Sequence, residues 1–203
     1  MTRRSLLFAI GLSGLWLKAW PGRALAAAQT DPEWIRMWEA AQKERPATIP
    51  PVARIAPASE PGQPLIIHGR LLAKDGRQPL GSVVVFAYHT GQDGLYERPG
   101  QPGWRLKGWA KTNADGTFEF QTIRPGPYPG RAIAAHVHLS ADGPGAPREW
   151  LDELQFADDP LVKDEDRRKS DQAGPFGTIR PVRTVAGVQH CDVIFRLTGA
   201  HRF

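Results

Sequence analysis

The sequence predicts an all-β protein, with a β-sandwich core preceded by an N-terminal helix and a proline-rich arm. Between residues 65 and 197, short segments rich in β-branched and aromatic residues follow one another closely. Turns such as Asp75-Gly76 and Asp142-Gly143 separate them. Short strands with glycine and proline turns at this spacing are typical of sandwiches. A chain of 203 residues with 41% apolar composition can bury one such core.

Residues 1–28 have the layout of an export signal, with a basic start, an apolar run over residues 6–17 and alanines at positions 24, 26 and 28. Residues 2–7 add the twin-arginine pattern around Arg3 and Arg4, which predicts a periplasmic protein. The apolar run is too short for a stable membrane anchor, which is the alternative interpretation.

The formal net charge of +5 gives little support to a nucleic-acid partner. Four of these charges lie in residues 1–28, which contain no acidic residue, so +1 remains when they are subtracted. Cys191 is the single cysteine, so no disulfide can form within the chain. It lies in an apolar run and is expected to be a small buried residue.

Residues 29–64 are expected to form a helix followed by an extended arm. The helix begins near Pro32, because proline is favoured in a first helical turn. An apolar stripe at helical spacing is expected to pack on the domain, with a homodimer contact as the alternative; it comprises Trp34, Met37, Trp38 and Ala41. Six prolines between residues 45 and 64 exclude regular helix there.

Residues 65–203 are expected to form the sandwich domain. The predicted strands are residues 65–72, 83–88, 104–111, 117–120, 131–140, 150–156 and 188–197. Residues 158–169 are dense in both charges and are expected to be a solvated loop or short exposed helix.

A candidate metal site lies around residue 130. On a strand, His136 and His138 share one face, so they can supply two ligands, although such a pair alone is often accidental. Tyr128 stands just upstream on a loop stiffened by prolines, and a phenolate is a hard anionic donor suited to highly charged iron. Tyr96, in a turn-rich segment after Gly94, is the preferred second phenolate.

The ordered combination of Gly94-x-Tyr96, residues 112–129 ending in Tyr128-Pro129, and His136-x-His138 resembles the intradiol ring-cleavage dioxygenases. This is the family of catechol and protocatechuate dioxygenases, and the resemblance covers roughly residues 60–160. It implies a non-haem Fe(III) ion held by four protein ligands, namely Tyr96, Tyr128, His136 and His138.

The resemblance also implies a reaction. An aromatic vicinal diol and O₂ are the expected partners, and O₂ is inserted between the two hydroxyl-bearing carbons to give a ring-opened, muconate-type diacid. Tyr128 and His138 correspond to the axial ligands, and Tyr128 is released to take a substrate proton. Tyr96 and His136 correspond to the equatorial ligands.

The chain departs from the family pattern at two places that bear on the substrate. Where the well-known enzymes have an arginine before the first histidine, this chain has Ile133, with Arg131 two residues earlier. Because the two would share a strand face, Arg131 is the expected substrate-contacting catalytic residue. Glu153 stands where the family commonly has glutamine, and Gln155 follows.

Two other function classes fit the same composition. A β-sandwich can serve as an exported binding module without catalysis, because this fold hosts many functions. The histidines can also serve another metal, such as zinc.

Overall fold

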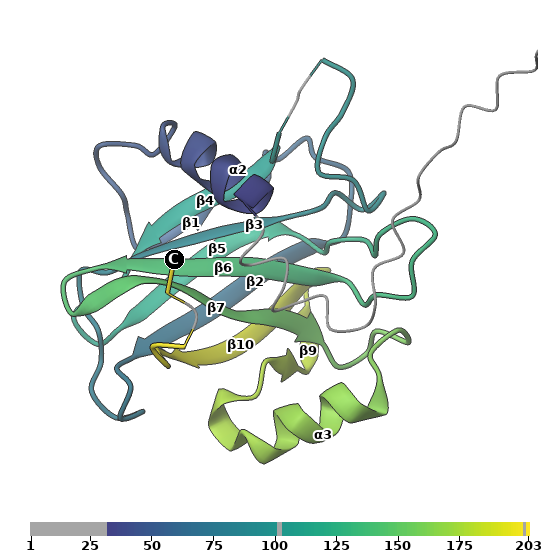
Figure 1. Cartoon of the computed structure of the whole chain (residues 1–203). Helices are drawn as coiled ribbons and strands as arrows, with labels where there is room; N and C mark the ends of the chain where they lie inside the picture. The colour runs from purple at the N-terminus through teal and green to yellow at the C-terminus, as the bar shows by residue number, and fades with distance from the viewer. Residues whose placement is uncertain (1–31, 101–102, 201) are drawn as a thin grey trace, which may run out of the picture.

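Two five-stranded sheets pack face to face, with helix α2 lying against one of them (Figure 1). The computed structural model describes residues 32–100, 103–200 and 202–203, so the predicted signal peptide lies outside the described residues. The first sheet has the order β1-β5-β2-β10-β9 and the second β4-β3-β6-β7-β8. The predicted all-β sandwich is therefore confirmed.

The bounds of the elements follow the predicted pattern with additions. In the first sheet these are β1 Val52–Arg54, β2 Pro64–Leu72, β5 Thr117–Ile123, β9 Val182–Val185 and β10 Val188–Arg196. In the second they are β3 Val84–His89, β4 Leu106–Lys111, β6 His136–Gly143, β7 Ala146–Phe156 and β8 Ile179–Arg180. The helices are α2 Pro32–Gln42, α3 Asp164–Gln172 and the 3₁₀ turn Gly174–Phe176.

The core lies between the sheets and is built by alternation along the strands. Ile67, Phe120 and Cys191 point inward from the first sheet and are fully buried, as expected for Cys191. Strand β3 is buried on both faces. Its Val85 faces the main core, whereas Phe86 faces a second cluster under α2.

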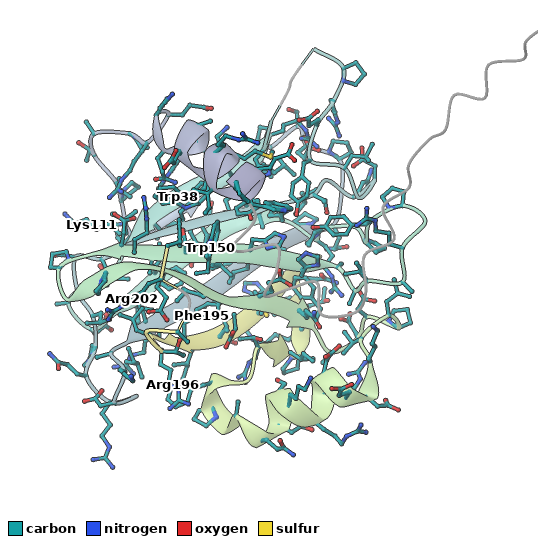
Figure 2. All side chains as sticks on the ribbon, in the orientation of Figure 1. Trp38, Lys111, Trp150, Phe195, Arg196 and Arg202 are labelled. Carbon is teal, nitrogen blue, oxygen red and sulfur yellow. The ribbon has the colours of Figure 1, made fainter. Side chains whose placement is uncertain are left out.

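Helix α2 covers the outer face of the second sheet, and its apolar stripe packs within the chain. Trp38 is buried against Phe86 and its Nε1 donates a hydrogen bond to Ser140 Oγ at 2.9 Å. Figure 2 shows Trp38 between the helix and the sheet, near Trp150 of β7. The homodimer through this helix stays a prediction.

The proline-rich arm follows the surface of the sandwich and pairs with it. Proline carbonyls still accept hydrogen bonds, and those of Pro50 and Pro51 accept from the N–H groups of Lys111 and Glu119 at 3.0 and 2.8 Å. The arm thereby supplies β1, which pairs in parallel with β5. No strand was predicted there.

One other expectation needs correction. Residues 131–135 are not a strand, because β6 begins at His136, and the N–H of Ala135 donates to the carboxylate of Asp159 at 2.8 Å. The turn predicted at Asp75-Gly76 forms, with the N–H of Ala73 donating to the carbonyl of Gln78 at 2.8 Å, and the chain then passes from the first sheet to the second. The charged segment forms the exposed helix α3 (Figure 1). Among the described residues, no helix is both long and apolar enough to cross a membrane.

Candidate metal centre

Two loops, residues 90–96 and 124–130, interlock and bring two tyrosines together. The N–H of Gly126 donates to the carbonyl of Gly91 at 2.9 Å. Gly94 has a φ of 77°, and a Cβ there would collide with the carbonyl oxygen of Pro127. The glycine before Tyr96 is therefore required by the close approach of the two loops, which places the hydroxyls of Tyr96 and Tyr128 2.6 Å apart.

The two histidines enter from the start of β6 on one face, despite a register shift between Val137 and Leu139. His136 Nδ1 lies 2.7 Å from the carbonyl oxygen of Ala134, and His138 Nδ1 lies 2.9 Å from a carboxylate oxygen of Glu153. Both partners are acceptors, so each Nδ1 carries the proton. The Nε2 lone pairs remain, and these two atoms lie 3.1 Å apart.

The structure brings all four predicted ligands into one cluster. Tyr128 Oη lies 3.2 Å from His136 Nε2 and 3.3 Å from His138 Nε2, in addition to its contact with Tyr96. Both histidine residues are buried. Four Lewis bases from three chain segments therefore converge on one point.

Burial sets the protonation of this cluster. It raises the pKa of Tyr96 well above its usual value and that of Tyr128 to about 12, and it lowers the pKa of His136. Without a cation the phenols stay protonated at neutral pH. Their two protons are too few to give each of the four clustered oxygen and nitrogen lone pairs a hydrogen bond. A bound cation would stabilise the tyrosinates and accept all four lone pairs at once, so the donor set fits a metal ion.

Glu153 belongs to the site as the hydrogen-bond partner of the proposed ligand His138, and is not itself a proposed ligand. His136, His138 and Glu153 lie close enough to resemble a two-histidine, one-carboxylate metal set. The carboxylate, however, contacts Nδ1 of His138, the nitrogen turned away from the cluster. Burial alone would raise the pKa of Glu153, but His138 and His136 hold it below its usual value. Glu153 is thus an anion that orients His138.

Aromatic side chains enclose the cluster. The ring of Tyr88 stacks on His138 at 4.7 Å between centroids, and Trp104 stacks on Tyr88 at 3.6 Å. Tyr88 therefore acts through its ring face, which agrees with the choice of Tyr96 as the second phenolate. Trp34 of α2 lies 5.5 Å from the His138 ring and 5.9 Å from that of Tyr96.

Trp34 is a site residue that sequence reasoning missed. Its helical spacing indicated only the packing of a stripe, and no local pattern shows which part of the sheet a helix will cover.

A cavity of about 790 Å³ opens in front of the two tyrosines. Its walls come from α2, the loop around Tyr96 and the loop after Tyr128. Arg131 is exposed and lines this cavity. The prediction that Arg131 lies on a strand was wrong. It lies in a turn, where its N–H donates to the carbonyl of Tyr128 at 3.2 Å.

Comparison with known proteins matches residues 41–186 to a family described as Dioxygenase. Catechol 1,2-dioxygenase 1 from Acinetobacter lwoffii is 31% identical over 126 residues, which is 52% of this chain and 40% of that protein. The beta chain of protocatechuate 3,4-dioxygenase from Burkholderia cepacia is 28% identical over 113 residues, 50% of this chain and 48% of that one. This chain thus spans about half the length of the curated relatives it matches.

Solved structures share the fold. The dioxygenase domain of a dioxygenase and carbohydrate-binding protein fusion from Streptomyces sp. SirexAA-E has a TM-score of 0.57 at 26% identity, over 75% of this chain and 90% of that chain. The family match covers well over half of the sequence, and its curated relatives include catechol and protocatechuate dioxygenases. The chain belongs to the dioxygenase family that contains the intradiol ring-cleaving enzymes, whose members use non-haem iron.

Proposed function

We propose that this protein is a non-haem Fe(III) intradiol dioxygenase that inserts O₂ into a catechol-type aromatic diol. The observation that carries the proposal is the convergence of two phenols and two Nε2 atoms within 2.6 to 3.3 Å. Two tyrosinates and two neutral imidazoles are a hard, anionic set that favours Fe(III) over Fe(II). The proposed ligands are Tyr96, Tyr128, His136 and His138.

The reaction needs only the diol and dioxygen. The carbon–carbon bond between the two hydroxyl-bearing carbons breaks, both atoms of O₂ enter the product, and a muconate-type diacid forms. Tyr96, Tyr128, His136 and His138 would hold the ferric ion, which would supply a Lewis acid for the two diol oxygens and make the diol reactive toward O₂. Because the diol must lose both protons, the protein has to supply a group that takes one of them.

Tyr128 is best placed to take a proton from the diol at its Oη. It contacts all three other donors and is half-buried at the wall of the cavity. Burial raises the pKa of Tyr128 to about 12, so its phenolate oxygen would be basic enough to hold a phenolic proton.

Arg131 is proposed to contact the bound substrate and stabilise the negative charge that develops on ring cleavage. It lines the same cavity as Tyr128. Burial raises the pKa of Tyr128, and the positive charge of Arg131 acts in the opposite direction, so the guanidinium field reaches the donor cluster.

The test is an oxygen-uptake assay of iron-loaded protein with catechol, protocatechuate and hydroxyquinol, in wild type and Arg131→Ala. We expect one O₂ consumed per diol and a visible tyrosinate-to-iron band before substrate is added. In Arg131→Ala we expect slower turnover with the colour retained.

The outcomes separate the alternatives. A colourless, iron-free preparation after expression with added iron would favour the exported binding module, and a stoichiometric zinc content would favour a zinc site. Uptake unaffected by Arg131→Ala would leave the enzyme assignment and remove the role of Arg131.

A further inference from the structure

We propose that the cavity in front of the tyrosines accepts an aromatic diol larger than one ring, and that Trp34 of helix α2 and Leu95 form the subsite for the part beyond the diol. This inference rests on the proposed function, since the diol ring itself is placed by the donor cluster.

The size of the cavity is the first reason. At about 790 Å³ it lies in the upper part of the range of roughly 300–1,000 Å³ that is typical of sites for drug-sized ligands. A single-ring diol fills only a small part of such a space. The tyrosines occupy one wall, so most of the volume lies beyond the position of the diol.

The lining of that remaining volume is the second reason. It is largely apolar, with Trp34, Met37, Leu95 and Pro99 among its residues. Leu95 is 49% exposed, so its apolar side chain is open to contact at the cavity wall. A second ring or apolar extension would cover Leu95 and remove this surface from water.

The rigidity of Trp34 is the third reason. Its ring lies 5.3 Å from that of Trp104 and meets the ring of Tyr96 edge-on at 81°. One turn later, Trp38 anchors the helix through its hydrogen bond to Ser140. Trp34 is only partly buried, so it borders the cavity as a fixed aromatic surface, which is suited to contact with a second ring.

The charged side chains around the cavity do not favour a charged group on the part of the substrate beyond the diol ring. Arg98 is paired with Glu60 at 2.8 Å, and Glu33 and Glu97 also line the cavity. The role proposed for Arg131 is to stabilise the negative charge that develops at the diol ring. The extension is therefore inferred to be an uncharged aromatic or apolar group.

The test measures anaerobic binding to iron-loaded protein, followed through the change in the visible tyrosinate-to-iron band, with catechol and 3,4-dihydroxybiphenyl. In wild type we expect the two-ring diol to bind at least about tenfold more tightly. Trp34→Ala should reduce that preference about tenfold, whatever smaller loss of catechol affinity follows from its contacts with His138 and Tyr96. Leu95→Ala should act in the same direction by a smaller factor.

Leu95→Ala removes an exposed side chain, so it keeps the test decisive if Trp34→Ala folds poorly. Val185→Ala on β9 is the matched control, because Val185 is 52% exposed and lies outside the cavity lining. Equal affinity for both diols in wild type, or equal losses for both in Trp34→Ala and Leu95→Ala, would overturn the subsite. A band that responds to neither diol would instead overturn the proposed function.

Discussion

A carboxylate oxygen of Glu153 lies 2.9 Å from Nδ1 of His138, and the exposed fractions of the two side chains are only 6% and 8%. A buried carboxylate that accepts from the far nitrogen of a metal-binding histidine fixes the tautomer and the ring orientation, and it makes the other nitrogen a stronger donor. The second carboxylate oxygen of Glu153 is buried without a hydrogen-bond partner among the described residues. The charge of Glu153 is therefore directed at His138.

Glu153→Gln is expected to retain iron while raising its reduction potential. The amide oxygen can still accept from Nδ1, but the negative charge is lost, so His138 donates less electron density. The visible band should move to longer wavelength, because a more electron-poor ferric ion accepts charge from tyrosinate more easily. Redox titration and absorption spectra measure both effects. Glu153→Ala, which leaves Nδ1 unpaired, should weaken iron binding about 10- to 100-fold.

Asp152→Asn is the control for charge alone, because Asp152 is the exposed neighbour on the same strand. If Asp152→Asn and Glu153→Gln shift the potential equally, the contact with His138 has no special role.

Tyr128→Phe should change the colour of the iron protein and slow turnover about 10²-fold or more, while the fold stays intact. Only one hydroxyl is removed, but it is the one in contact with all three other donors. Tyr88→Phe is the matched control, because Tyr88 is a tyrosine of the same site that stacks on His138 through its ring. Absorption spectra and steady-state rates compare the two, and an unchanged band in Tyr128→Phe would contradict its assignment as a ligand.

Removing iron should destabilise the folded protein, because four converging donors lose their common partner. At a free iron concentration 100 times Kd, binding contributes about 2.7 kcal/mol. For a chain of this size that corresponds to a fall in Tm of about 5 to 10 °C. His136→Ala and His138→Ala should show low iron content and no such difference between iron-treated and chelator-treated samples. Calorimetry with metal analysis tests this, and full iron occupancy in both variants would contradict the site.

Stability should fall in acid partly because of His89. Burial lowers its pKa from 6.5 to about 4, and the hydrogen bond to the carbonyl oxygen of Thr90 offsets only part of this effect. Between these values the unfolded chain binds a proton that the folded chain does not, so the unfolding free energy decreases as pH falls from about 6.5 to about 4. The loss is about 2 to 3 kcal/mol.

Urea unfolding of iron-free protein near neutral pH and near pH 4.5 measures this loss. His89→Gln should show a smaller decrease than wild type, since other titrating groups such as His136 contribute equally to both. The same pH dependence in both proteins would exclude His89 as a cause.

The twin-arginine pattern predicts export. Replacing Arg3 and Arg4 together by lysine should leave the precursor in the cytoplasm, because this export route reads the arginine pair as an address. Fractionation followed by N-terminal sequencing is the measurement. The exported form should begin near Ala27 or Gln29, and exported protein that still begins at Met1 would refute the signal.

The sequence by itself determined the properties that depend on neighbours along the chain. Short segments rich in β-branched and aromatic residues between glycine and proline turns predicted the sandwich. Two-residue alternation placed His136 and His138 on one face, where their Nε2 atoms lie 3.1 Å apart. The resemblance of the ordered motif to the intradiol dioxygenases picked out Tyr96 and Tyr128 as ligands. These patterns are local, so they can be read without knowing the path of the chain.

Only the tertiary structure decided which distant groups surround those four residues. Trp34 reaches the cavity because α2 packs on the second sheet, and Glu153 reaches His138 because β7 lies beside β6. Residues 131–135 leave the strand because the buried carboxylate of Asp159 binds the N–H of Ala135. Such contacts join segments through the packing of a whole core, and side-chain periodicity within one segment carries no information about which other segment will pack against it.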